Sequence, residues 1–424
     1  MEDPDAGKKM MWNSAPPLTS HTPATTLISD RAYRLCMSPP LVDLFGRPVT
    51  GLRVSITNRC QLDCFYCHRE GTEGAGEEME VEDFEKIAST ASRLGIKKVK
   101  ITGGEPLIRE DVVDIVRVFA RHFEEVSLTT NGLLLADLAA DLKKAGLKRA
   151  NVSLDTLKPD VYSRITGYGG RDGVDAVMTG IKKAIRAGLT PVKVNTVLMK
   201  GINDTCWLNI ARKVTSLGAK SQLVEFVHPA EKTNAPEYVS RHADMGDVIG
   251  TLEKMAVETY ERPLHRRKTY VLDFGTHRGE VEVVQPMHNT VFCENCTRLR
   301  VTPDGKLKTC LLGGIETPLL SRSPGEEDIE RAFRRALLSR YPYWGKKTGI
   351  NLLLFSTARE KVGEDVIKMF VPPGTTAGDL LSFVKKTFPG MGDMLISVNR
   401  EYADEKKELL DGDEVALFPP VGGG

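Results

Sequence analysis

The chain has 424 residues, of which 41% are hydrophobic, and its formal net charge is +1. Nearly balanced charge argues against nucleic acid or a membrane surface as the main partner. No apolar run approaches the roughly 20 residues that span a bilayer, and the N-terminus lacks the basic and apolar regions of a secretory signal. We therefore expect a cytoplasmic protein of about three domains.

Six of the eight cysteines fall into two tight groups. Eight cysteines in a chain of this length are too few for a disulfide scaffold. The two groups therefore indicate metal binding in a reducing compartment. Cys36 and Cys206 stand apart, and we interpret each as an ordinary small residue, buried or semi-buried.

Strand and helix patterns alternate through the first half of the chain. Residues 1–45 are rich in Pro, Ser and Thr and predict a disordered tail. From 46 to 228, helical patterns separate six apolar, β-branched runs, at 52–57, 97–103, 125–131, 149–155, 192–198 and 221–227. This alternation predicts an α/β fold with a parallel sheet. Six units suit a partial, open barrel better than a closed barrel of eight.

Polar residues gather where the predicted strands end. Ligands of parallel α/β folds bind at this edge, so we expect these segments to form one site. They are the cysteines after the first strand, Thr102–Pro106, Thr129–Asn131, Ser153, Asp155, Lys193, Asn195 and Glu225.

The rest of the chain divides into two regions. Residues 229–345 are less regular and carry the second cysteine group, so we expect an auxiliary-cluster region there. From 350 to 424, strand patterns at 350–356, 366–371, 395–399 and 414–418 surround a helical pattern at 377–387. This β-β-α-β-β order predicts a small α+β domain of the ubiquitin-like β-grasp type.

The first cysteine group, Cys60, Cys64 and Cys67, has the spacing C-x3-C-x2-C and follows the first strand. Three thiolates can hold three corners of an iron–sulfur cube and leave one iron open to another ligand. The alternative is a zinc site with His68 as the fourth ligand, although structural zinc sites more often use paired C-x2-C knuckles.

A glycine-rich turn, Gly103-Gly104-Glu105-Pro106, ends the second strand. Glycines leave backbone groups exposed, so such a turn can bind an amino group and a carboxylate. Together with the cysteine spacing, the turn resembles the radical S-adenosylmethionine enzymes. The resemblance implies that S-adenosylmethionine chelates the open iron and that Tyr66 lies beside its adenine. One electron would then cleave it to a 5′-deoxyadenosyl radical, which abstracts hydrogen from a substrate.

The second group, Cys293, Cys296 and Cys310, has the spacing C-x2-C-x13-C. No fourth cysteine follows it, which favours another cluster with an open iron over a structural zinc knuckle. Arg298 and Arg300 come directly after Cys296, and arginine pairs with phosphate oxygens through two hydrogen bonds. Alone, an Arg-x-Arg pair is usually a solvated strand.

Over residues 40–335 this arrangement resembles the GTP 3′,8-cyclase family, which begins molybdenum cofactor synthesis. The resemblance implies two [4Fe–4S] clusters, the second orienting guanine. It also implies radical abstraction at C3′ of the GTP ribose and bond formation to C8, giving 3′,8-cyclo-7,8-dihydro-GTP. The implied contacts to S-adenosylmethionine are Tyr66, Gly104, Ser153 and Val227, and those to GTP are Arg53, Lys100, Thr129, Lys193, Arg298, Leu299 and Arg300. Val227 departs from the family, which has methionine there.

The final segment, Asp411-Gly412-Asp413-Glu414-Val415 through Gly424, resembles the sulfur-carrier subunit of molybdopterin synthase. The resemblance implies that a separate enzyme adenylates the Gly424 carboxylate, which becomes a thiocarboxylate. The tail would then donate sulfur inside the catalytic subunit of the synthase. Other implied partners are the downstream accessory enzyme that forms cyclic pyranopterin and an electron donor, and a homodimer is compatible with them.

Two alternatives stay open: a radical enzyme that acts on a peptide or another small molecule, and a sulfur carrier with a degenerate cyclase half. Stand-alone cyclases of the family also end in a Gly-Gly tail that serves the active site. Here the corresponding segment, 344–350, lacks Gly-Gly and runs into the carrier. The tail is then dispensable, or the carrier's own end replaces it, or the chain is cut near Gly349.

Overall fold

The computed structural model describes residues 40–71, 76–227, 236–313, 316–320 and 325–420. The predicted disordered tail lies outside these residues up to position 39. The structure does describe residues 40–45 of this tail, and they are packed: Leu41 is 1% exposed and Val42 forms a β-bridge with Pro48. The expectation of disorder therefore does not hold for residues 41–45, whose side chains find partners within the fold. Among the described helices, none is long and apolar enough to cross a membrane.

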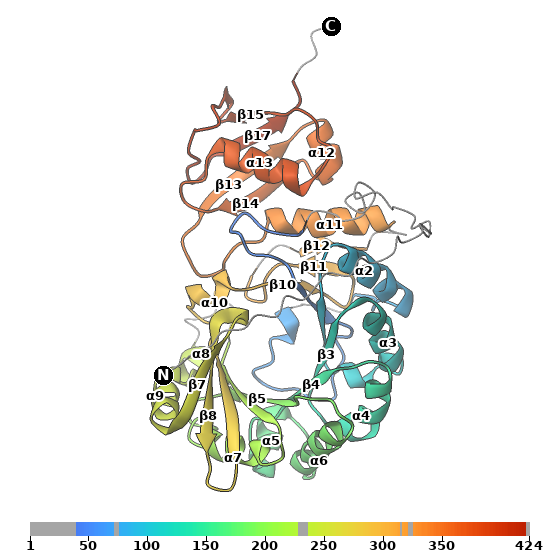
Figure 1. Ribbon diagram of the computed structural model, residues 1–424, viewed down its shortest axis with the longest axis vertical. Coiled ribbons are helices and arrows are strands. Elements are labelled where there is room, and N and C mark those ends of the chain that lie inside the picture. The colour runs from blue at the N-terminus through green and yellow to red at the C-terminus, as the bar shows by residue number, and fades with distance from the viewer. Residues whose placement is uncertain (1–39, 72–75, 228–235, 314–315, 321–324, 421–424) are drawn as a thin grey trace, which may run out of the picture. The chain divides into compact units, whose positions relative to one another are not determined.

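Six parallel strands form the centre of the fold (Figure 1). They are β1 (Gly51–Ser55), β2 (Lys98–Thr102), β3 (Glu125–Thr130), β4 (Arg149–Ser153), β5 (Lys193–Leu198) and β6 (Lys220–Glu225). Each pairs with the next in chain order. The strands fall within the predicted runs or one residue from them, and the predicted partial barrel of six units is confirmed.

Helices between the strands cover the outer face of this sheet, as α2, α3, α4 and α6 show in Figure 1. The set is α2 (Val81–Arg93), α3 (Val112–His122), α4 (Leu135–Lys144), α5 (Pro159–Thr166), α6 (Gly173–Arg186) and α7 (Trp207–Thr215). Two short 3-10 helices, η1 (Arg69–Gly71) and η2 (Pro106–Ile108), lie in the connections that follow β1 and β2. In α2, Phe84, Ile87, Ala88 and Ala91 form one buried stripe. Their spacing is that of an amphipathic helix, so burying the stripe holds α2 on the sheet.

The region from 236 to 345 is more regular than expected, because it extends the barrel sheet on both sides. β9 (Arg278–Val284) runs parallel to β6, and β10 (Arg298–Val301) runs parallel to β1. The other elements are α8 (Pro236–Arg241), α9 (Met245–Met255), β7 (Ala256–Arg262), η4 (Leu264–Arg266), β8 (Arg267–Asp273), α10 (Thr290–Glu294), β11 (Lys306–Lys308), β12 (Glu316–Pro318) and α11 (Glu326–Leu338). Several of these strands are short, and β7 is largely exposed, so they lack the apolar runs that mark buried strands.

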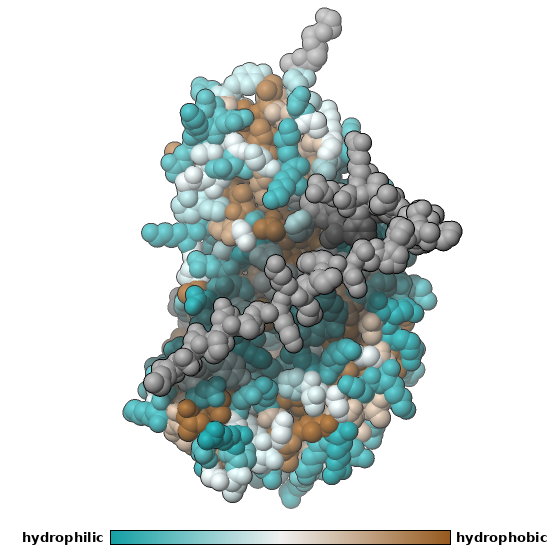
Figure 2. All heavy atoms as spheres, in the orientation of Figure 1, coloured by the Kyte–Doolittle hydropathy of each residue, from teal (hydrophilic) through white to brown (hydrophobic). Residues whose placement is uncertain are grey.

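The last domain has a five-stranded sheet in the order β14-β13-β17-β15-β16. Its elements are β13 (Thr348–Leu354), α12 (Thr357–Val362), β14 (Val366–Val371), α13 (Ala377–Thr387), β15 (Leu395–Val398), β16 (Glu401–Tyr402) and β17 (Glu414–Phe418). The central strands β13 and β17 are parallel. The predicted β-grasp order is confirmed, and α12 and β16 are additions. In Figure 2, hydrophobic side chains lie among hydrophilic ones on the visible face of this domain.

Candidate active site

The first cysteine group lies in the loop that follows β1. The three thiols lie within range of one another's charge. Burial is the largest cause that raises the pKa of the Cys64 thiol to about 12, and nearby negative charges, including those of the other two cysteines, add to it. Backbone N–H groups donate to two of the sulfurs, from Leu62 to Cys60 Sγ and from Arg69 to Cys67 Sγ, each over 3.4 Å. Hydrogen bonds to the sulfurs are one means by which proteins tune iron–sulfur clusters.

This set of donors fits a cluster. Among the described residues, no three His, Cys, Asp or Glu side chains are placed to hold a single metal ion. One zinc ion needs every thiolate within about 2.3 Å of one point, whereas an iron–sulfur cube presents a separate iron to each thiolate. Three cysteines in one loop, whose thiols lie within range of one another's charge, supply the donor set of such a cube.

Backbone contacts fix the glycine-rich turn against the cysteine loop. A Cβ on Gly104 would lie 2.2 Å from the carbonyl oxygen of Arg59, so only glycine fits this close approach. The N–H of Gly104 donates to the Thr57 carbonyl over 2.7 Å, and the N–H of Glu105 donates to that of Arg59 over 2.8 Å. The predicted turn is thus one unit with the loop that carries the first cysteine group.

The Glu105 side chain joins the ends of β2 and β3. It is buried and accepts hydrogen bonds from Thr130 Oγ1 over 2.7 Å, from Asn131 N over 2.6 Å and from Leu107 N over 3.0 Å. Burial raises the pKa of Glu105 to about 7, although these hydrogen bonds act in the opposite direction. Glu105 therefore keeps the two strand ends together.

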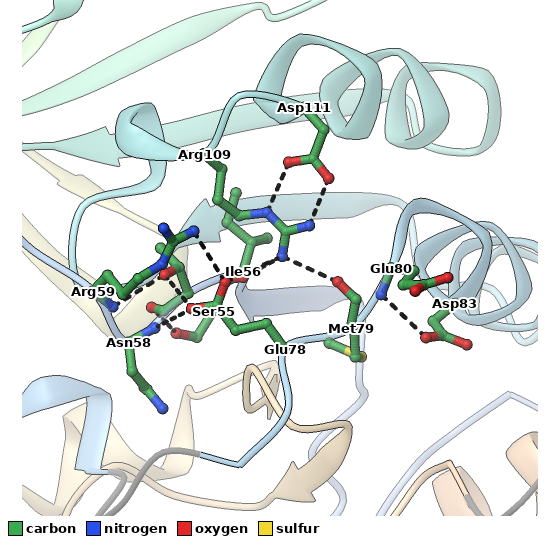
Figure 3. Close-up of polar contacts among 11 residues, drawn as sticks. Ser55, Ile56, Asn58, Arg59, Glu78, Met79, Glu80, Asp83, Arg109 and Asp111 are labelled. Atoms are coloured by element: carbon green, nitrogen blue, oxygen red, sulfur yellow. Dashed lines mark hydrogen bonds and ion pairs between the residues drawn. The ribbon is translucent and has the colours of Figure 1, made fainter.

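Arg109 is a buried residue of the site that we did not predict. Figure 3 shows its guanidinium between the carboxylate of Asp111 and two main-chain carbonyls. Nη1 donates to Ile56 O over 2.7 Å and to Met79 O over 3.0 Å, while Nε and Nη2 donate to Asp111 over 2.8 and 2.6 Å. Because Ile56 directly follows β1, Arg109 fixes the point at which the cysteine loop begins.

Three positions predicted to contact S-adenosylmethionine, Tyr66, Ser153 and Val227, lie on one side of the barrel edge. Tyr66 donates its hydroxyl hydrogen to Asp155 Oδ2 over 2.5 Å, and Asp155 follows Ser153 by two residues. Tyr66 and Val227 pack against one apolar cluster. Its buried members are Phe226, Tyr238 and Met287. Val227 is thus an apolar, partly buried neighbour of Tyr66.

The second cysteine group joins α10, which carries Cys293, to Cys296 and to Cys310 after β11. The thiols again lie within range of one another, because Cys310 and Cys296 both raise the pKa of Cys293, after burial as the largest cause. Burial also acts to raise the pKa of Cys296, but the guanidinium of Arg340 and the N–H of Arg298 lower it overall. Three thiols and a nearby cation suit a second anionic cluster.

The linker to the carrier passes this second group. Trp344 donates its indole N–H to Pro286 O over 2.8 Å, and its ring lies 4.2 Å from that of His288, centroid to centroid. It also packs against the apolar cluster that contacts Tyr66 and Val227. The segment 344–350 is therefore anchored at Trp344 beside the second cysteine group.

Cationic side chains of neighbouring strands meet on the inner face of the sheet. Arg53 on β1 is in register with Lys100 on β2 and with Arg300 on β10. Burial, followed by the charges of Arg149, Arg298, Arg53 and Lys193, holds the pKa of Lys100 well below its usual range. Four of the residues predicted to contact GTP thus form one positive surface, which we call the basic row: Arg53, Lys100, Arg298 and Arg300.

The remaining predicted GTP contacts differ from the basic row. Lys193 is 3% exposed and forms a buried ion pair with Glu282 of β9. Thr129 is half-buried on the same face of the sheet as Asn151, its register partner. Leu299 alternates with Arg298 and Arg300 along β10, so its side chain lies on the other face, in the hydrophobic core. Only its backbone can face a ligand in the barrel.

Comparisons with known proteins agree with this division of the chain. Family models match residues 54–214 as the Radical SAM superfamily, 220–345 as Molybdenum Cofactor Synthesis C and 352–424 as the ThiS family. A "Probable GTP 3′,8-cyclase" of Thermococcus kodakarensis is 47% identical over 309 residues, which are 72% of this chain and 99% of that protein.

The chain belongs to the GTP 3′,8-cyclase family. A second cyclase relative, from Pyrococcus abyssi, is 48% identical over 309 residues, with the same coverage of both chains. The carrier region, in turn, is similar to the crystal structure of SAMP1 from Haloferax volcanii, with 28% identity, coverage of 18% of this chain and 99% of that chain, and a TM-score of 0.16.

Several charged residues of this GTP 3′,8-cyclase family site escaped prediction. Besides Arg109, they are Glu70, Arg149, Arg267 and Arg340. Arg149 stands at the start of the predicted strand β4, where alternation alone could have marked it as inward-facing, whereas Arg267 begins β8, a strand that was not expected. Glu70 and Arg340 lie outside strands, and no local pattern distinguishes them from solvated charges. Their burial follows only from long-range contacts.

Proposed function

We propose that this chain cyclises GTP to 3′,8-cyclo-7,8-dihydro-GTP in molybdenum cofactor synthesis. The observation that carries the proposal is the pairing of β10 with β1. That pairing brings Arg298 and Arg300 beside Arg53 and Lys100, and β1 leads into the loop that carries the first cysteine group. A triphosphate needs such a concentration of fixed positive charge.

The proposal assigns one [4Fe–4S] cluster to each cysteine group and S-adenosylmethionine to the first. When bound, the first cluster and S-adenosylmethionine supply the one-electron chemistry that removes a hydrogen atom from the substrate. The protein's own part is to orient. Tyr66, fixed by Asp155, and Gly104, fixed against the cysteine loop, support the proposed S-adenosylmethionine site, with Ser153 and Val227 beside them.

The basic row would hold GTP by its phosphates, and the second cluster would take the guanine. Two fixed ends leave the ribose little freedom, which matters because a radical must meet one C–H bond among several. Thr129 and Lys193 complete the proposed contacts. Lys193 now forms a buried ion pair with Glu282. It can contact GTP only if it leaves Glu282 and binds the ligand instead.

The carrier domain serves a separate step of the same pathway in this proposal. Its Gly424 lies outside the described residues. We assign to it the thiocarboxylate, formed after adenylation by a separate enzyme and used by the catalytic subunit of molybdopterin synthase. An accessory enzyme would consume the cyclised nucleotide, and an external electron donor would start the reaction in the cytoplasm.

Anaerobic reconstitution with GTP, S-adenosylmethionine and a reductant tests the proposal. We expect about eight irons per chain, four for each cluster, and a cyclised GTP product. The Arg298→Ala variant should lose the product while still binding S-adenosylmethionine. The matched control is Arg93→Ala, which removes an exposed arginine paired with Glu326 and should retain full activity. Cleavage of S-adenosylmethionine by the wild type without any GTP-derived product would contradict the proposal.

A further inference from the structure

The carboxylate of Glu70 lies between Arg53 and Arg300 of the basic row. Oε1 accepts hydrogen bonds from Arg53 Nε over 3.1 Å and from Thr102 Oγ1 over 2.9 Å, and Arg53 Nη2 also donates to it. Oε2 accepts from Arg300 Nη1 over 2.7 Å. One carboxylate therefore takes donors from two of the three arginines that the proposed function assigns to the triphosphate.

Little space remains around Glu70. The cavity lined by Arg53, Ser55, Glu70, Thr102 and Arg300 has a volume of about 10 Å³. A cavity of that size holds at most about one water molecule. No phosphoryl group can share it with the carboxylate, and two anions in one buried place would also repel each other.

The backbone that presents Glu70 is in an uncommon conformation. Arg69 has φ +45° and Glu70 has φ +54°, so two successive residues with side chains lie in the left-handed region. Such residues carry conformational strain unless their surroundings compensate for it. Here the bonds to the two arginines hold the segment in place. A ligand that takes those bonds would free the segment to relax.

We propose that the Glu70 carboxylate occupies the phosphate-binding position of the basic row, and that the triphosphate of GTP binds by displacing this carboxylate. This inference rests on the proposed function, because it takes the basic row as the phosphate site. Glu70 then determines affinity: part of the binding free energy of every phosphorylated ligand goes into breaking its bonds to Arg53 and Arg300. A triphosphate carries several negative charges and can displace a single carboxylate. An uncharged nucleoside does not need to displace Glu70 in order to bind.

Equilibrium binding to the reconstituted holoenzyme tests the inference with three probes: GTP, inorganic tripolyphosphate and guanosine. In Glu70→Gln the competing charge is gone, so the Kd of GTP and of tripolyphosphate should both fall about tenfold, while the Kd of guanosine stays the same. The control is Glu85→Gln. Glu85 also bonds two basic side chains, Arg121 and His122, but on the outer helices α2 and α3, and its variant should bind all three probes as the wild type does.

The outcomes separate the two proposals. If the wild type binds GTP but Glu70→Gln binds it equally or more weakly, Glu70 only positions the arginines and the inference fails. If the wild type binds neither GTP nor tripolyphosphate, the proposed function fails as well.

A measurement on the wild type covers the case in which the variant does not fold. Amide hydrogen exchange at Glu70 should become faster when tripolyphosphate binds, because the segment leaves the arginines. Slower or unchanged exchange on saturation would overturn the inference.

Discussion

Arg340 and Asp43 form a buried ion pair, with 2.6 Å between Nη1 and Oδ2, although 297 positions separate them in the chain. Arg340 also donates to the carbonyl oxygens of Arg47 and of Cys296, and Arg47 donates to that of Cys293 over 3.1 Å. The segment before β1 and the end of α11 thus hold the loop of the second cysteine group from both sides.

Asp43→Asn should destabilise the protein strongly. The side chain keeps its shape but loses its charge, which leaves the guanidiniums of Arg340 and Arg47 buried without a counter-ion. We expect the free energy of unfolding to fall by about 3–5 kcal/mol, as measured by urea denaturation. Glu326→Gln, which breaks an exposed pair with Arg93, should change it by less than about 1 kcal/mol. Equal effects of the two variants would show that the buried pair has no special role.

Lys100→Met should weaken GTP use and stabilise the free protein at the same time. Lys100 lies among other cations, and burial with their repulsion already lowers its pKa. Removing its charge should lower kcat/KM for GTP at least about tenfold and raise the free energy of unfolding by about 1 kcal/mol. Steady-state kinetics and urea denaturation measure the two effects. Lys97→Met, at an exposed pair with Glu124, should do neither. A destabilised Lys100→Met with unchanged kinetics would remove Lys100 from the site.

The raised pKa of Glu105 predicts a pH dependence of stability. In the folded protein the carboxyl group keeps its proton up to about pH 7, against a usual pKa of 4.5. The unfolded chain therefore releases a proton first, and stability falls as pH rises from about 4.5 to about 7. The loss is at most about 3 kcal/mol. Thermal unfolding across this range should show it in the wild type and not in Glu105→Gln. Parallel profiles of the two proteins would contradict the assignment.

Trp344→Ala should lower cyclase activity although Trp344 precedes the carrier domain. The indole fixes the linker beside the second cysteine group, and a small misplacement there can cost tenfold or more in rate, on the order seen for other enzymes. Deletion of residues 421–424 should leave cyclase activity unchanged if the anchored linker takes the part of the family's tail. The control is Tyr402→Ala, an exposed aromatic residue of the carrier. Loss of cyclase activity on deleting 421–424 would favour the opposite arrangement.

Local patterns were enough to predict most of the fold. The six apolar runs of the barrel and the order of the carrier strands follow from periodicity, because buried strands and amphipathic helices repeat their apolar residues at fixed intervals. The cysteine spacings and the Gly104 turn could also be interpreted directly. In contrast, the ribbon of β7 and β8 lacks a continuous buried run, so its strands were not expected.

The charged residues of the site required the three-dimensional structure. Lys193 and Glu282 are buried together, and Glu70 lies between Arg53 and Arg300. Each pairing joins segments far apart in the chain. A buried charge is acceptable only when its partner is present, and sequence alone does not show which partner that is.

The parallel pairing of β13 with β17 has a consequence for how the carrier can work while attached. The linker enters the small sheet at the beginning of β13, so the chain that continues past Phe418 leaves β17 at the opposite end of the sheet. Six residues follow Phe418 in the sequence, a reach of roughly 20 Å when extended. An enzyme that takes up the segment after Phe418 would therefore approach the small sheet at the end opposite the tether.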